Sequence, residues 1–306
     1  MNKNNPKVSV YIPAYNHEEY VEQAVLSIIN QTFQDFELLV IDDGSTDRTP
    51  LILEQLSKQY GFYYGRQENR GVCRTLNTLA GMAKGAYLTL CASDDFWPAT
   101  RLEEQISILN NEPTVDMVHS KVSFVDSTGV VIKSPADSRP FVNGNDQFLK
   151  FVMHRLNYSA GTVMIRKTAF DRVGDYHEGI LVEDFEWWMR ACRKLNIKFV
   201  DAKWLFYRRH PTNFVQTPAG ALKAVKSHYT VAKELGFLYG SLFLITSISN
   251  LVLWESTAGR KRRYWFILLI PVLFWNVRFI KGVLISLFGY SKMATLKNSL
   301  RRHRKS

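Results

Sequence analysis

Hydrophobic and polar positions along the first hundred residues alternate in blocks that have the lengths of strands and helices. Six blocks predict strand, helix, strand, helix, helix and strand in turn: 8–15, 18–31, 36–42, 48–60, 77–85 and 86–92. The strand blocks are nearly continuous apolar runs, as in parallel strands buried on both faces. The helical blocks repeat apolar residues at helical spacing. We therefore predict βαβ units that build a parallel sheet.

The pattern loosens after about residue 115. We predict a strand and turn over 115–129, a loop over 134–146, where Pro, Gly and Asp are frequent, and a strand with a short helix over 158–174. The stretch 183–195 is a strong candidate for a helix. The whole chain of 306 residues has room for one large domain or two ordinary ones.

Three pairs of acidic residues stand at predicted element boundaries: Asp42-Asp43, Asp94-Asp95 and Glu183-Asp184. The first two pairs end strands, and ligands of open parallel sheets bind outside the carboxyl ends of strands. Carboxylates are ligands for Mg²⁺ or Mn²⁺ ions that hold substrate phosphates, and the third pair offers a general base. Asp also occurs as an ordinary turn or capping residue. The residues alone indicate a metal–phosphate site whose reaction they leave open.

Five motifs around these pairs occur along the chain in a defined order and spacing. They are VSVYIPAYNHEEYVEQAVLSIINQTFQDFELLVIDDGSTDRT, ENRGVCRTLN, AKGAYLTLCASDDFWPATRLEEQI, VEDFEWWMR and YRRHPTNF. Over roughly residues 7–215 the chain resembles the inverting family 2 glycosyltransferases. The resemblance implies an α/β, Rossmann-like GT-A domain over 1–217. Residues 218–306 then form a C-terminal helical region that we expect to associate with a membrane.

The resemblance implies a donor site for a nucleotide-diphosphate sugar, which we expect to be UDP-linked. Pro13 and Tyr15 resemble the strand-end loop that packs on the nucleotide base. Asp43, with Asp42 beside it, resembles the carboxylate that reads the base. We expect the acceptor to be a lipid-linked or growing surface glycan.

The resemblance also implies a site for Mg²⁺ or Mn²⁺ and a catalytic base. Asp94 and Asp95 resemble the DXD element that holds the metal against the diphosphate, with Asp95 as the expected metal ligand and Asp94 on the donor side. His210 resembles a C-terminal position that helps to ligate the metal or the diphosphate. Asp184 resembles the general base that deprotonates the acceptor hydroxyl in a single inverting displacement.

One position departs from the pattern of many relatives, which carry an acid where this chain has Ala92. The motif D-x-D-D is A-S-D-D here. Variants that keep only the last two acids occur in the family, so we expect activity with a reduced set of metal ligands.

Several other residues have more than one interpretation. Trp187 and Trp188 either both pack in the core or present one ring to an acceptor sugar. Arg190 is solvated, pairs with an acid, or faces the diphosphate. A loop with Asn69, Arg70 and Arg74 can approach the donor. Five histidines show no metal-ligand spacing and are predicted to be structural or surface residues: His17, His119, His154, His177 and His228.

The net charge of +11 is concentrated at the C-terminus. Residues 256–306 hold twelve Lys or Arg and no acid, which leaves 27 basic against 28 acidic residues in the rest of the chain. Beside this charge, 237–254 and 264–277 are dense in apolar and aromatic residues, which favours an anionic membrane surface over nucleic acid. We expect residues 237–306 to anchor the protein peripherally or monotopically on the cytoplasmic face of the cell (inner) membrane.

A transmembrane hairpin is the rival interpretation. Residues 237–254 are barely long enough to span a bilayer and carry several polar residues. A hairpin would also place the basic run 260–263 on the far side, against the positive-inside rule. In a third interpretation both segments pack on the catalytic domain.

Two other functional classes stay open on the sequence. A catalytically silent protein with the same fold could dock a glycan or a partner enzyme, although the acids of the motifs are retained. A nucleic-acid-binding protein using the basic tail would need a motif that the sequence does not offer. Three cysteines without metal spacing suggest a reducing compartment, and the first residues show no apolar segment typical of a secretory signal.

Overall fold

The computed structural model describes residues 5–133, 139–178, 183–211, 213 and 231. The chain divides into two compact units, one of Met1–Phe151 with Arg155–Ser227 and one of Val152–His154 with His228–Ser306. The predicted boundary between 217 and 218, and the predicted membrane-associating segments, lie outside the described residues. Within the described part of the chain, no helix is both long and apolar enough to cross a bilayer.

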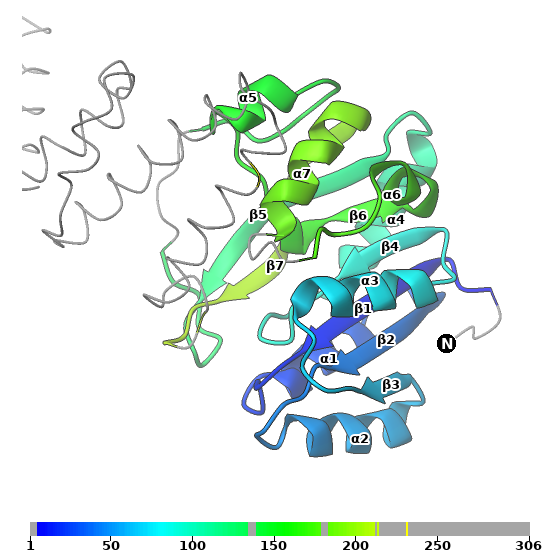
Figure 1. Ribbon diagram of the computed structural model, residues 1–306, viewed down its shortest axis with the longest axis vertical. Helices are drawn as coiled ribbons and strands as arrows, with labels where there is room; N and C mark the ends of the chain where they lie inside the picture. Colours follow the sequence, from blue (N-terminus) through cyan, green and yellow to red (C-terminus); the bar gives the residue numbers. More distant parts are fainter. Residues whose placement is uncertain (1–4, 134–138, 179–182, 212, 214–230, 232–306) are drawn as a thin grey trace, which may run out of the picture. The chain divides into compact units, whose positions relative to one another are not determined.

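The described strands form one seven-stranded sheet in the order β3-β2-β1-β4-β6-β5-β7 (Figure 1). Their bounds are β1 Val8–Ala14, β2 Phe36–Asp42, β3 Tyr63–Arg66, β4 Tyr87–Leu90, β5 Met117–Val125, β6 Met164–Arg166 and β7 Ile197–Arg208. The neighbours β1–β2, β1–β4, β2–β3 and β5–β7 are parallel. The predicted α/β class is confirmed.

The parallel sheet predicted for the first hundred residues is confirmed by strands β1 to β4, and β6, which lies beyond that stretch, pairs antiparallel with both β4 and β5. Between β5 and β6 the described elements are the five-residue helix Phe148–Val152 and the 3₁₀ turn Ala160–Thr162. An antiparallel partner needs no crossover helix, so a strand of only three residues can fill the gap between β4 and β5. The result is a mixed sheet, as is common among large sheets.

The described helices are α1 Val21–Ile29, α2 Thr49–Tyr60, α3 Val72–Met82, α4 Arg101–Asn111, α5 Phe148–Val152, α6 Lys167–Val173 and α7 Glu183–Lys194. Figure 1 shows α3, α6 and α7 across the near face of the sheet. A side-chain hydrogen bond joins α1 to α4. Gln31, just beyond α1, accepts it from the Leu102 amide of α4 at 3.0 Å. Helix α3 begins and ends earlier than predicted, and Gly85 lies beyond it. A Cβ atom on Gly85 would come within 2.5 Å of the Ser9 amide nitrogen, so this glycine permits a close backbone approach.

The sheet positions the site through the direction of its strands. Strands β1 and β2 are buried along almost their whole length, which explains their continuous apolar runs. Because β4 and β5 both run antiparallel to β6, the strands β1, β2, β4 and β7 end at the same edge of the sheet. The loops that follow these four strands therefore converge.

His119 on β5 is a buried histidine with a structural role. Its Nε2 lies 2.8 Å from the Val142 carbonyl, and Trp188 packs against the ring at 4.9 Å. Its Nδ1 has no hydrogen-bond partner among the described residues. Burial lowers the pKa of His119 from 6.5 to about 4, so the folded protein holds this ring neutral at pH 7.

We expect His119 to make folding sensitive to acid. Between pH 6.5 and 4 the unfolded chain binds a proton at this side chain and the folded chain does not, so stability is present above the unfolded pKa and falls as the pH falls. From pH 7 to pH 5 the loss is about 2 kcal/mol. Urea unfolding of wild type and His119→Gln at both pH values measures this loss, with the exposed His177→Gln as control. Equal pH dependence in wild type and His119→Gln would contradict the assignment.

Candidate functional site

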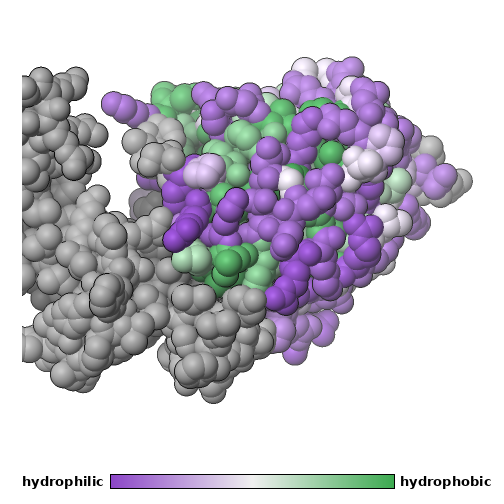
Figure 2. Space-filling model, turned by 90° about the horizontal axis from the view of Figure 1, so that it is seen from above, coloured by the Kyte–Doolittle hydropathy of each residue, from purple (hydrophilic) through white to green (hydrophobic). Residues whose placement is uncertain are grey.

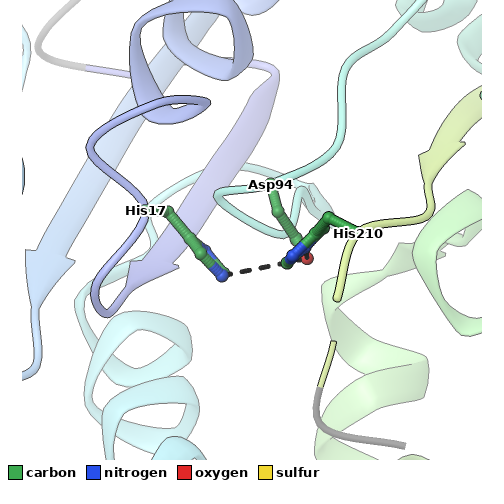
Figure 3. A group of neighbouring side chains, drawn as sticks. All are labelled: His17, Asp94 and His210. Carbon is green, nitrogen blue, oxygen red and sulfur yellow. Dashed lines mark hydrogen bonds and ion pairs between the residues drawn. The ribbon is translucent and has the colours of Figure 1, made fainter. Parts of the chain in front are cut away.

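Three side chains meet at the edge where the strands end. His17 follows β1, Asp94 follows β4 and His210 follows β7, and Figure 3 shows their polar ends converging. The Asp94 Oδ2 atom lies 3.1 Å from His210 Nε2 and 3.9 Å from His17 Nε2. One potential ligand atom from each residue lies within 4.8 Å of the others. Two imidazoles and a carboxylate so arranged can hold a divalent metal ion.

The loop after β1 is fixed by hydrogen bonds to the segment that opens α2. The Asn16 amide donates to Ser45 Oγ, and the His17 amide donates to Thr49 Oγ1, both at 2.9 Å. Asn16 has a φ angle of +51°, a left-handed conformation that Asn tolerates better than most residues. These contacts turn the chain at the end of β1 and direct His17 toward Asp94.

Arg208 joins the end of β7 to the acidic pair. Its amide donates to Asp95 Oδ1 at 2.9 Å, and its Nε donates to the Asp94 carbonyl at 2.8 Å. The guanidinium also packs over the Tyr20 ring at 4.8 Å. Arg208 is buried, so these bonds satisfy its donors inside the protein and set the position of Asp94 and His210 together.

Asn213 and Asp94 both approach the His210 ring. The His210 amide donates to Asn213 Oδ1 at 2.7 Å, which directs the Asn213 NH₂ group to His210 Nε2 at 2.9 Å. The same Nε2 lies 3.1 Å from Asp94 Oδ2. The Asn213 NH₂ group also lies 3.4 Å from Asp94 Oδ2, so the same carboxylate accepts from it. Two imidazoles and one carboxylate are donor groups that a divalent ion accepts, so the residues present fit a metal ion.

The electrostatics of the group suit a cation. Burial raises the pKa of Asp94, but its contact with His210 and the nearby His17 outweigh burial, and the pKa lies below its usual value. Burial lowers the pKa of His17, although Asp94 opposes that shift. Near neutral pH the group therefore offers one carboxylate and a neutral His17 imidazole, which are the metal-binding forms.

Asp95 lies outside this group of ligand atoms. Its carboxylate is buried and accepts the Arg208 amide, and burial followed by the charge of Asp94 raises its pKa well above the usual value. From the sequence, Asp95 is the predicted metal ligand and Asp94 is a predicted residue of the sugar-donor site. In the structure it is Asp94 that contacts His210. The role of Asp95 at a metal stays a prediction.

Asp42 and Asp43 both hold the loops beside the site. Asp42 accepts a hydrogen bond from the Ser45 hydroxyl and forms an ion pair with Arg66 at 3.2 Å. Asp43 accepts Gln67 Nε2 at 2.7 Å and the amides of Arg70 and Gly71 at 2.9 Å. These bonds fix the loop that contains Asn69 and Arg70 against the ends of β2.

Asp184 opens α7, where its Oδ1 accepts the Phe185 amide at 2.7 Å and its Oδ2 lies 3.4 Å from the Tyr158 hydroxyl. Burial raises the pKa of Asp184, partly opposed by these hydrogen bonds. Burial and then the charges of Asp95, Asp94 and Asp184 raise the pKa of Tyr207 to about 12.

The remaining predicted residues divide between surface and core. Pro13 lies within β1, and Tyr15 just beyond it is 46% exposed, as a base-packing ring would need to be. Trp187 and Trp188 are both buried, which confirms the core interpretation. Arg190 pairs with Glu186 at 2.6 Å and donates to carbonyls at the end of α6, so the ion-pair interpretation holds.

His17 is the site residue that sequence reasoning missed. It was predicted to be structural or on the surface, and it lies instead beside Asp94 and His210. No spacing motif reveals such a group, because its members come from three distant strand ends. The available signal was a histidine directly after a buried strand whose neighbouring strand ends in two acids.

One face of the described part of the molecule is mixed in character. Figure 2 shows hydrophilic residues over much of this face, with smaller hydrophobic areas between them. Large exposed apolar side chains such as Tyr15, Leu51 and Tyr63 lie on or beside the strands and helices of the N-terminal half.

Sequence comparison identifies relatives along most of this part of the chain. An uncharacterized glycosyltransferase of Rickettsia typhi is 27% identical over 226 residues, 72% of this chain and 70% of that protein. An uncharacterized glycosyltransferase of Haemophilus influenzae is 34% identical over 44% of this chain and 55% of that protein. Chondroitin synthase of Escherichia coli is 33% identical over 43% of this chain and 19% of that much longer protein.

Solved structures share the fold. S. aureus TarS 1-349 in complex with UDP-GlcNAc superposes with a TM-score of 0.63 at 18% identity, covering 90% of this chain and 79% of that one. The mannosyltransferase PcManGT of Pyrobaculum calidifontis, with GDP-Man and Mn²⁺, has a TM-score of 0.55 at 15% identity and covers 94% and 89%. The family model for glycosyl transferase family 2 matches residues 9–174, more than half of the sequence. The chain therefore belongs to glycosyl transferase family 2 and is a glycosyltransferase.

Proposed function

We propose that the protein is an inverting glycosyltransferase that moves a sugar from a UDP-linked donor to a lipid-linked or growing surface glycan. The observation that carries the proposal is the convergence of Asp94 and His210 at the strand ends. The UDP-GlcNAc complex of TarS supports a UDP-linked donor, and the likeness to chondroitin synthase supports a glycan as the acceptor.

The residues present would hold Mg²⁺ or Mn²⁺ through Asp94 and His210. When bound, the ion supplies positive charge that stabilises the departing diphosphate. Asp43 and the exposed Tyr15, together with the adjacent Asp42 and Pro13, are the proposed residues of the nucleotide-base site. Binding the base at that site positions the anomeric carbon next to the acidic edge.

Asp184 takes the proton of the acceptor hydroxyl. Its raised pKa makes it a stronger base than an ordinary aspartate, and its two hydrogen bonds orient the carboxylate. The acceptor oxygen forms a bond to the anomeric carbon on the face opposite the diphosphate. The bond between that carbon and the diphosphate oxygen breaks, and its electron pair leaves with the nucleotide. A single displacement of this kind inverts the configuration.

We further propose that the protein acts at the cytoplasmic face of the cell (inner) membrane. The support is the sequence of residues 237–306, where apolar and aromatic runs lie beside a basic, acid-free tail. Anionic lipid vesicles that bind the full chain more strongly than neutral vesicles, with an affinity that falls at high salt, would support this placement. A chain that binds neither kind of vesicle would contradict it.

Calorimetric titration with UDP, GDP and dTDP, each with and without Mn²⁺, tests the donor. We expect UDP to bind, and to bind more tightly with Mn²⁺. Because the loop amides already hold the Asp43 carboxylate, Asp43→Ala is expected to weaken nucleotide binding through this loop as well as through the lost contact to the base. If none of the three nucleotides binds, the proposal is wrong and a silent binding protein is the better explanation.

A further inference from the structure

We propose that His17 is a direct metal ligand, and that its imidazole together with that of His210 makes the site prefer transition metals such as Co²⁺, Zn²⁺ and Mn²⁺ over Mg²⁺. The inference rests on the proposed function, because it concerns the same metal site. It goes further by assigning a ligand outside the acidic motif and by ordering the metals.

The position of His17 is that of a ligand held from behind. Its Nδ1 lies 2.8 Å from Ser93 Oγ, while its Nε2 faces Asp94 Oδ2 at 3.9 Å. A histidine that binds a metal through one ring nitrogen usually has a hydrogen bond at the other, which fixes the tautomer and the ring. With Nδ1 donating to Ser93, the lone pair of Nε2 points into the group. The backbone bond of His17 to Thr49 holds the residue in place.

The distance between His17 and Asp94 is also that of two ligands of one ion. At 3.9 Å the two atoms are too far apart for a hydrogen bond. Two ligand atoms that each lie about 2.1 Å from a metal are separated by about 3–4 Å. The rings of His17 and His210 stand edge to face, at 88° and 5.7 Å, so their nitrogens approach from different directions.

His210 presents the second nitrogen. Its Nε2 lies 3.1 Å from Asp94 Oδ2, and the Asn213 NH₂ group contacts the same nitrogen at 2.9 Å. That NH₂ group also lies 3.4 Å from Asp94 Oδ2, so Asn213 can donate to the carboxylate when the ring nitrogen binds an ion. The described geometry thus brings two ring nitrogens and one carboxylate oxygen within 4.8 Å of one another.

The donor set decides the choice of metal. Mg²⁺ requires oxygen ligands in near-ideal octahedral geometry, whereas imidazole suits zinc and other transition metals, and affinity rises from Mn²⁺ through Co²⁺. Where the family pattern often has a further acid, this chain has Ala92, so the grouped ligand atoms in the described part of the chain are one carboxylate and two imidazoles. Replacing a carboxylate by a neutral imidazole also leaves the bound ion one charge more positive toward a diphosphate.

Titrations of the full chain with Co²⁺ and with Mg²⁺, alone and with UDP present, test the inference. We expect Co²⁺ to bind wild type more tightly than Mg²⁺, with a visible absorption spectrum altered by nitrogen ligands. His17→Ala is expected to weaken Co²⁺ about tenfold or more and to shift that spectrum, with a smaller effect on Mg²⁺. His17→Glu restores an oxygen ligand and is expected to bring the two affinities closer together. The exposed His177→Ala is the control for metal bound at a surface histidine.

The outcomes separate this inference from the proposed function. If wild type binds metal and UDP and both His17 variants keep the wild-type Co²⁺ affinity and spectrum, His17 is not a ligand and the proposed function stands. If wild type binds metal and UDP but favours Mg²⁺, the selectivity is overturned. If wild type binds neither metal nor nucleotide, both proposals are wrong. Thermal unfolding shows whether each variant is folded. If one His17 variant does not fold, the Co²⁺ affinity and spectrum of the other His17 variant test whether His17 is a ligand.

Discussion

Replacing Asp184 by Asn is expected to lower the rate of sugar transfer about a thousandfold while leaving nucleotide binding unchanged. The amide keeps the shape of the side chain and an oxygen for the Phe185 amide, but it cannot accept the acceptor proton. Because Asp184 is not one of the three grouped ligand residues, UDP titrations should give the same affinity in variant and wild type. Initial rates with a glycan acceptor measure the loss.

The pH profile provides a second test of the same residue. Burial raises the pKa of Asp184, so the basic carboxylate is lost as the pH falls through a value above that of an ordinary aspartate. In wild type, kcat/KM should therefore fall on the acid side at a correspondingly higher pH, and Asp184→Asn should lack that limb. The exposed Asp171→Asn on α6 is a matched control and should keep both the rate and the limb. A variant at Asp184 that keeps the wild-type rate would exclude it as the base.

The edge of the sheet that carries the site followed directly from the sequence. Apolar runs that end in Asp42-Asp43 and in Asp94-Asp95 were enough to place two loops at the carboxyl ends of buried strands, because a parallel strand buried on both faces leaves a continuous apolar signal. The fold class and the family were predicted for the same reason, since their motifs lie in these loops.

The missed strands lack that signal. Strand β3 is half exposed along its four residues, and β7 mixes buried and exposed positions with two register shifts against β5. An edge strand or a bulged strand does not alternate regularly between a core face and a solvent face, so periodicity does not find it. The antiparallel direction of β6 depends on tertiary pairing, which a run of three residues does not encode.

The metal group was predicted only in part for a related reason. Motifs identified Asp94 and His210. Which acid of the Asp94-Asp95 pair contacts His210 depends on Arg208, whose amide donates a hydrogen bond to the Asp95 carboxylate. His17 has no motif of its own. Its role depends on a turn at Asn16 and on the convergence of three strand ends, and both are properties of the folded chain.

Replacing Asp94 by Asn is expected to abolish the metal dependence of nucleotide binding and to reduce transfer by about a hundredfold or more. Asp94 supplies the only carboxylate of the metal group in the described part of the chain, and its pKa lies below the usual value, so it is ionised at neutral pH. An amide at this position keeps the shape but removes the charge that attracts a divalent cation. Titration of UDP into the variant with and without Mn²⁺ should give the same affinity in both conditions.

Asp95→Asn is the matched control, because it changes the adjacent carboxylate in the same way. Its amide oxygen can still accept the Arg208 amide at the position where Asp95 Oδ1 lies, so the loop should keep its conformation. If Asp94 is the ligand, Asp95→Asn retains the Mn²⁺ dependence that Asp94→Asn loses. The opposite result, with Asp95→Asn losing the dependence and Asp94→Asn keeping it, would return the metal to Asp95 as the sequence motif suggested. In that case Asp95 would supply the carboxylate ligand of the metal ion, and the contacts of His17 and His210 with Asp94 would not be contacts between ligands of one ion.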